Sequence, residues 1–146
     1  MSNKEIKEIC ITTSHVFYKF VNDSEVYNDI LRISRNRISY KRYYFLDNQI
    51  LNFWDYSTSS DIFTTNYDEL CTHIQSITMP YMRVTDCGSF KIEIIYTNMT
   101  TDVFEYDSDF HFNQMDFISY LIKKLIPVGE LYSDLLDYDD LANLDY

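Results

Sequence analysis

Glycine and proline are nearly absent from this chain, since its 146 residues contain two of each. This scarcity excludes collagen-like and low-complexity classes. It also removes the phosphate-binding loops that need several closely spaced glycines. Hydrophobic residues make up 46% of the chain and aromatic residues 17%, so we do not expect the chain as a whole to be disordered. The length favours a single domain spanning residues 1–146, with one core.

Cysteine is scarce and irregularly spaced. Cys10, Cys71 and Cys87 are an odd number without a C-x-x-C pair, so they predict neither a disulfide framework nor a zinc site. We interpret them as reduced, mostly buried thiols. Long apolar runs are missing as well, so the sequence predicts neither a signal peptide nor a membrane-spanning helix. We therefore expect a cytoplasmic protein without membrane contact.

Catalytic and metal-binding patterns are also missing, because no G-x-S-x-G, H-E-x-x-H or P-loop motif occurs. Cys71 and His73 are two residues apart in a predicted helix, where their side chains diverge by about 200°. Asp107, Asp109 and His111 resemble the start of a calcium loop that lacks its glycine and distal glutamate. Helix capping explains that cluster. We expect no enzyme, metal or cofactor, although 23 acids leave a paired-carboxylate glycosidase open.

Charge is strongly acidic and unevenly distributed. Twelve basic residues against 23 acidic ones give a net charge of −11. Residues 1–101 carry only −2 of this, whereas residues 102–146 have two bases against eleven acids, a net of −9. Residues 30–46 hold five bases and no acid. Such a balance argues against general nucleic-acid binding, which needs a basic surface.

The basic segment has the period-2 pattern of a β-hairpin, with Arg35-Asn36 as its turn. The core-facing side chains would be Leu31, Ile33, Ile38 and Tyr40. Arg32, Ser34, Arg37, Ser39 and Lys41 would face outward. Three interpretations stay open for the positive charges. They are a solvated sheet face, a pairing with the acidic C-terminal residues, or a nucleic-acid surface that uses Arg32, Arg37, Lys41 and Arg42 beside Tyr40, Tyr43 and Tyr44.

Further strands and two helices are predicted around this hairpin. Strands are expected at 6–12, 15–21, 50–56, 90–96 and 103–106, with turns at 22–24 and 86–88. One helix begins at Ser59 or Ser60 and ends by Pro80, and it buries Ile62, Phe63, Tyr67, Leu70, Ile74 and Ile77. A second, capped by Ser108 or Asp109 and ending before Pro127, buries Phe112, Met115, Ile118, Ile122 and Leu125. The fold class is therefore α+β, an antiparallel sheet of hairpins with two main helices packed on it.

The acidic tail, residues 130–146, combines acids with large apolar side chains and no base. It could be a fraying helix and a solubilising terminus, but its apolar content favours docking on a partner. Apolar anchors would be Leu135, Leu136 and Tyr138. The acidic contacts would be Asp134, Asp137, Asp139 and Asp140 of the tail, together with Asp102, Glu105, Asp107, Asp109 and Asp116.

In size, acidity and lack of catalytic motifs, the chain resembles the small inhibitors of phages and mobile elements, including anti-CRISPR and other DNA-mimic proteins. The resemblance covers mainly residues 102–146. It implies a non-enzymatic binder that blocks a basic nucleic-acid-handling protein, such as a nuclease or a CRISPR effector. Immunity proteins against nuclease toxins share this profile. The alternative is direct nucleic-acid binding through the hairpin at 30–46. The sequence indicates no oligomeric state.

Overall fold

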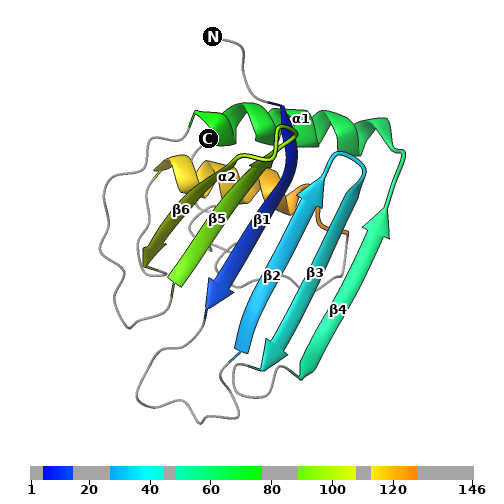
Figure 1. The fold of residues 1–146 in the computed structure, drawn as a ribbon. Helices are drawn as coiled ribbons and strands as arrows, with labels where there is room; N and C mark the ends of the chain where they lie inside the picture. The colour runs from blue at the N-terminus through cyan, green and yellow to red at the C-terminus, as the bar shows by residue number, and fades with distance from the viewer. Residues whose placement is uncertain (1–4, 15–26, 45–48, 77–88, 108–112, 128–146) are drawn as a thin grey trace.

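The computed structural model describes residues 5–14, 27–44, 49–76, 89–107 and 113–127, which form six strands and two helices (Figure 1). The first four strands are β1 (Ile6–Ser14), β2 (Tyr27–Ser34), β3 (Arg37–Tyr44) and β4 (Ile50–Ser57). They are followed by helix α1 (Asp61–Gln75), strands β5 (Ser89–Tyr96) and β6 (Thr101–Asp107), and helix α2 (Asn113–Lys123). This arrangement confirms the predicted α+β class.

All six strands form one antiparallel sheet in the order β4-β3-β2-β1-β5-β6. The first four strands are consecutive neighbours, and β5 then pairs with the other side of β1. β1 is therefore central, while β4 and β6 form the two edges of the sheet in the described part of the chain (Figure 1).

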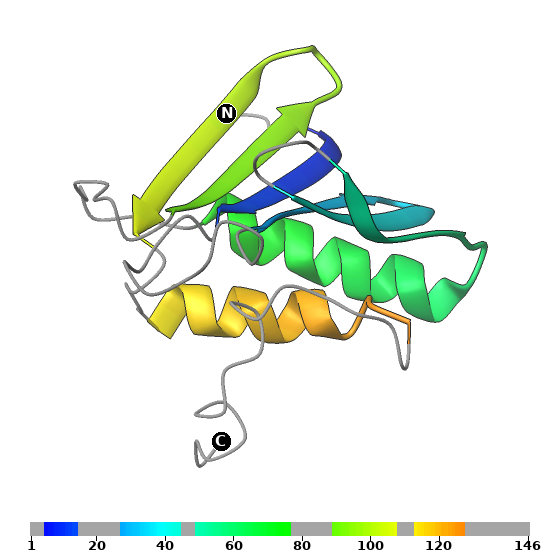
Figure 2. The ribbon, with the colours of Figure 1, turned by 90° about the horizontal axis from the view of Figure 1, so that it is seen from below.

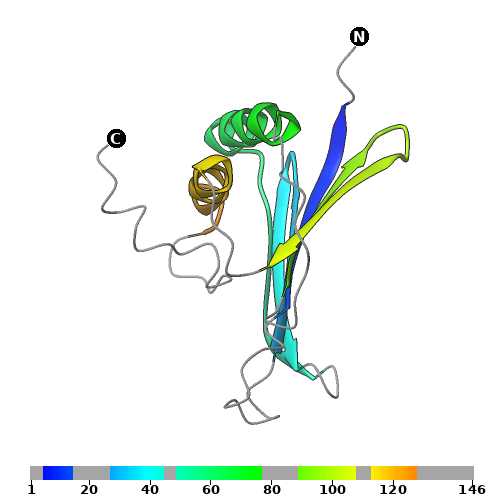
Figure 3. The same cartoon turned by 90° about the vertical axis from the view of Figure 1, so that its left-hand side faces the viewer.

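The core lies between one face of this sheet and the two helices, which cover the same side of the sheet (Figure 2, Figure 3). Every second residue along a strand points to this side, as the pleat requires. The sheet contributes Ile9, Ile11, Leu31, Ile33, Ile38, Tyr40, Trp54, Ile92, Ile94 and Tyr96 to the core. We call the opposite side, which neither described helix covers, the open face.

Helix α1 begins where its capping residue predicts. The Ser60 hydroxyl accepts a hydrogen bond from the Phe63 N–H, and the first helical residue is Asp61, an acid near the positive end of the helix dipole. Tyr67, Leu70 and Ile74 are buried and confirm the predicted stripe.

The assignment of Ile62 to that buried stripe of α1 is wrong, because its side chain is 75% exposed. Ile62 precedes Tyr67 by five residues, which rotates it by about 140° around the helix. At that angle it leaves the face that meets the sheet.

Helix α2 packs through Ile118 and Ile122, and Leu125 lies in the turn that follows the helix. All three are buried as predicted. Other predictions lie outside the described residues. These are the strand at 15–21, the turns at 22–24 and 86–88, Ile77 and Pro80, the caps Ser108 and Asp109, Phe112, and the helix in the acidic tail. Met115 lies within α2, but its side chain is not described.

Candidate functional site

The predicted basic hairpin forms as β2 and β3, with its turn at Arg35-Asn36. Its four predicted core residues are buried, which confirms the alternation. Arg32, Arg37 and Lys41 lie together on the open face, because opposed residues of antiparallel strands share a face. One row across that face consists of Asp55, Ser39, Arg32, Cys10, Glu93 and Val103.

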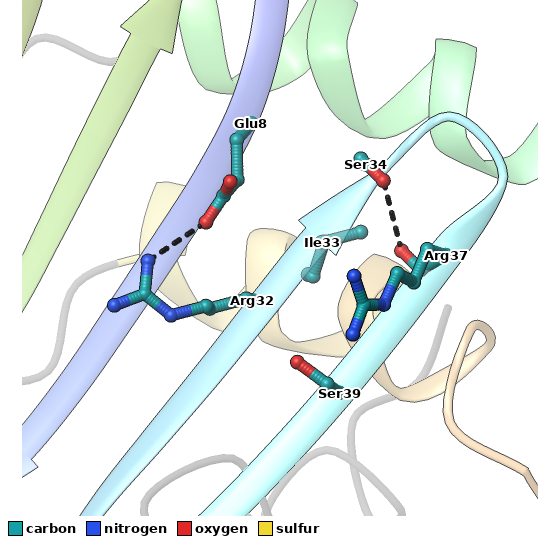
Figure 4. A pocket seen from close by; sticks show the side chains of 6 residues that line it. All are labelled: Glu8, Arg32, Ile33, Ser34, Arg37 and Ser39. Atoms are coloured by element: carbon teal, nitrogen blue, oxygen red, sulfur yellow. Dashed lines mark hydrogen bonds and ion pairs between the residues drawn. The ribbon is translucent and has the colours of Figure 1, made fainter. Parts of the chain in front are cut away.

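Arg32 forms an ion pair with a carboxylate of the neighbouring strand. Its Nη1 donates to Glu8 Oε1 at 2.9 Å, and this bond raises the pKa of the guanidinium (Figure 4). The pair borders a shallow pocket of about 140 Å³, which Ser34, Arg37 and Ser39 also line. Figure 4 shows these side chains on the side of the sheet that faces away from the helices.

Arg37 and Arg35 are paired as well. Arg37 binds both carboxylate oxygens of Asp55 on β4, with Nε donating to Oδ1 at 2.8 Å, and this pairing lowers the pKa of Asp55. Arg35 at the hairpin turn donates to Asp68 of α1 at 2.9 Å, so the turn is tied to the helix layer. Lys41 has its ammonium 5.3 Å from the centre of the Tyr43 ring.

Arg42 does not belong to the open face, contrary to its grouping with the other candidate contacts. It points to the helix side, where Nε and Nη2 donate to the two carboxylate oxygens of Asp29 at 2.8 and 3.0 Å. The side chains of Asp29 and Arg42 are only 2% and 13% exposed. The Tyr40 hydroxyl also donates to Asp29, at 2.8 Å, and burial beside this carboxylate raises the pKa of Tyr40.

These four ion pairs neutralise most of the basic segment within the fold. The partner carboxylates Glu8, Asp29, Asp55 and Asp68 lie on β1, β2, β4 and α1. Exposed pairs of this type add little stability, but each reduces the charge available to a phosphate. Sequence reasoning missed them because all four acids lie outside residues 30–46, with Asp29 immediately before this segment. Strand register and tertiary packing bring them close to the arginines.

Strand β6 carries acids that form no ion pair among the described residues, although Lys91 of β5 lies opposite Glu105 and pairs with Glu93. Asp102 and Glu105 are exposed, and no ion-pair partner of either occurs among the described residues. Asp102 accepts a 2.7 Å hydrogen bond from the Tyr96 hydroxyl, and burial together with this bond raises the pKa of Tyr96 to about 12. Asp107 also belongs to β6 and Asp116 to α2, but their side chains are not described.

The remaining partner-binding candidates lie outside the described residues. They are Asp109 and the tail residues Asp134, Leu135, Leu136, Asp137, Tyr138, Asp139 and Asp140. The acidic tail contains six acids and no base, which is more than half of the net charge of the chain. The structure therefore places Asp102 and Glu105 on one strand, and it leaves their relation to the tail as a prediction.

Metal ligands and reactive thiols are not assembled in the described part of the chain. No group of three or more His, Cys, Asp or Glu side chains there could hold a metal ion. Cys10 and Cys71 are free, and burial raises the pKa of both, that of Cys71 to about 11. His73 packs its ring against Phe117 at 4.8 Å rather than sharing a site with Cys71.

Two further observations concern membranes and relatives. Neither described helix is long and apolar enough to cross a membrane. No protein-family model matches the chain, and no curated protein is significantly similar to it.

Proposed function

We propose that the protein is a non-enzymatic, acidic binding protein that inhibits a basic nucleic-acid-handling protein, such as a nuclease or a CRISPR effector. The observation that carries the proposal is an asymmetry of charge. Each arginine of the basic hairpin is paired inside the fold, whereas Asp102 and Glu105 on β6 have no ion-pair partner among the described residues.

Binding would use charge and apolar contact together. Uncompensated carboxylates attract a partner whose surface carries lysine and arginine, and they mainly accelerate association. Leu135, Leu136 and Tyr138 of the acidic tail would supply the buried anchors, which mainly slow dissociation. Asp outnumbers Glu sixteen to seven in the chain. The shorter Asp stem holds its carboxylate near the backbone, as a mimic of regularly spaced phosphates requires.

A capture experiment tests this function. The full chain, immobilised, would be incubated with a nuclease-treated bacterial lysate, and the bound proteins would be identified. We expect basic nucleases or effector complexes to be enriched, and nucleic acid added after removal of the nuclease to compete with the chain for them. Recovery of neutral metabolic enzymes alone would contradict the proposal.

Two charge variants sharpen that experiment. Asp102→Asn with Glu105→Gln removes two unpaired acids of β6, and it should reduce the recovery of the basic target. Glu5→Gln with Asp61→Asn removes the same number of exposed acids elsewhere and serves as the matched control. Equal loss in both variants would mean that only the net charge of the chain matters.

A second candidate function is direct nucleic-acid binding, and a specific observation favours it. Arg32, Arg37 and Lys41 share the open face with Phe53, whose ring is 59% exposed and could stack on a base. A gel shift that weakens with salt and disappears when all three basic residues are replaced by Ala would favour this function. Absence of a shift at low salt would remove it.

A further inference from the structure

The outer edge of β4 is apolar. Ile50, Leu51, Phe53 and Tyr56 are all exposed, and Phe53 on the open face is 59% exposed. No described strand pairs with this edge, so every second residue of β4 directs backbone N–H and C=O groups outward (Figure 1). An edge of this type is a template for another strand.

Features that normally prevent strand addition are missing from β4. Proteins protect such edges with lysine, proline or inward-pointing charges. The eight residues of β4 contain no proline and no lysine, and their only charged residue, Asp55, is neutralised by Arg37. The opposite edge, β6, contains Asp102, Glu105 and Asp107 within seven residues. Only one of the two edges is therefore protected by charge.

Apolar exposure continues around β4 to the helix side of the sheet. Tyr56 and the exposed Ile62 border a hollow of about 390 Å³, together with Phe63, Leu125 and Pro127. A strand added to β4 would thus find apolar surface on both faces of the sheet. Burial of such surface stabilises association in proportion to its area.

The distribution of charge favours a second copy of this chain as the occupant. A chain of net charge −11 repels its own copy unless the contact is locally neutral and distant from the acids. β4 meets both conditions, because Asp55 is paired and the acidic strand β6 is at the other end of the sheet. A basic foreign segment would instead be attracted to β6.

We propose that two copies of the protein associate through antiparallel pairing of their β4 strands, which joins two sheets into one. Centred on Phe53, a two-fold axis places the two Phe53 rings beside each other, a favourable cross-strand pair. The two Asp55 residues then lie four positions apart, or about 13 Å. That exceeds the screening length of about 8 Å at physiological salt, so they do not oppose pairing. The acidic β6 strands remain at the outer ends.

Sedimentation equilibrium of the full chain, from low micromolar to several hundred micromolar, tests this association. We expect a monomer–dimer equilibrium in the wild type. Phe53→Glu introduces a like charge at the centre of the pairing, and it should weaken the dimer at least about tenfold. The new carboxylate lies opposite Lys41, so the fold of the monomer should be retained.

Val103→Glu is the charge-matched control, because it adds one negative charge just as Phe53→Glu does. Val103 is 56% exposed on the open face of β6, at the opposite edge of the sheet. It should leave the dimer unchanged. A wild type that stays monomeric at every concentration, or equal weakening by both variants, would overturn the proposal. Circular dichroism of both variants verifies that they fold. If Phe53→Glu does not fold, Leu51→Glu repeats the test, because Leu51 lies opposite Asp55 of the second copy in this register. This inference does not depend on the proposed inhibitory function.

Discussion

Each half of the sheet contains a hydrogen bond from a tyrosine hydroxyl to an aspartate. Among the described residues, only one of these two aspartates also pairs with an arginine. In the half formed by β2 and β3, Tyr40 donates to Asp29, and Arg42 binds both oxygens of that buried carboxylate. In the half formed by β5 and β6, Tyr96 donates to the exposed Asp102, which has no cationic partner among the described residues.

This difference distinguishes a carboxylate that holds the fold together from one that is exposed at the surface. A buried carboxylate is tolerated only when it is paired and hydrogen-bonded, so Asp29 depends on its arginine. An exposed carboxylate needs no such partner, because water solvates it. The four arginines of the basic hairpin thus pair with acids of the same chain, whereas Asp102 and Glu105 form no ion pair among the described residues.

Removal of Asp29 should have the largest effect on stability. Asp29→Ala removes the buried carboxylate that binds Arg42 and Tyr40, and breaking a buried ion pair on one side costs about 3–5 kcal/mol in the free energy of unfolding. Asp102→Ala loses one hydrogen bond at the surface, or about 1 kcal/mol. Urea denaturation of both variants measures the difference. Equal losses would show that the two halves use their acids in the same way.

Variants of the acidic tail should separate anchors from steering charges, once a partner has been captured. Leu135→Ala with Tyr138→Ala should cost about 2 kcal/mol of binding, seen as about 30-fold faster dissociation. Asp139→Asn with Asp140→Asn should slow association and flatten its salt dependence. Surface plasmon resonance resolves both rates. Unchanged rates in both variants would mean that the tail only solvates.

Raising the pH should have a smaller effect on folding stability than these substitutions, and it should act through Tyr96 in the half of the sheet formed by β5 and β6. The pKa of Tyr96 is raised to about 12, from an ordinary value of about 10. The stability that comes from its protonated hydroxyl is therefore complete below about pH 10 and is lost as the pH rises towards 12. Tyr96→Phe should lose less stability than the wild type over this range in thermal denaturation. The exposed Tyr56→Phe is the control. If the stability of Tyr96→Phe fell as steeply with pH as that of the wild type, the effect could not be assigned to the hydroxyl of Tyr96.

Exposed pairs of the basic half should matter least for stability. Arg32→Gln with Arg37→Gln breaks two ion pairs on the open face, and it should move the denaturation midpoint only slightly. The freed carboxylates of Glu8 and Asp55 remain solvated. A large destabilisation would mean that these pairs hold the sheet together, as the Asp29 pair does.

The local sequence pattern predicted core residues and the start of a helix. It did not predict which distant strands pair with each other. Alternation placed Leu31, Ile33 and Ile38 in the core, and the capping preference of serine located the start of α1 at Ser60. The placement of β5 beside β1 depends on tertiary contacts that no local pattern contains.

The same limit applies to the candidate site. The sequence predicted that Arg32, Arg37 and Lys41 share one face. It did not predict the carboxylates that neutralise two of them, because Glu8 and Asp55 are 24 and 18 residues away along the chain. Arg42 was grouped with these contacts although strict alternation directs it to the other face, where Asp29 binds it.

A comparison of two probes tests most directly whether acids, and not the basic hairpin, drive recognition. Fluorescence anisotropy would be measured with the full chain at low salt, using a labelled lysine- and arginine-rich peptide and a labelled single-stranded DNA. We expect the peptide to bind, with affinity that falls in Asp102→Asn/Glu105→Gln, and the DNA to remain free. Binding of the DNA but not of the peptide, abolished when Arg32, Arg37 and Lys41 are replaced by Ala, would contradict this expectation.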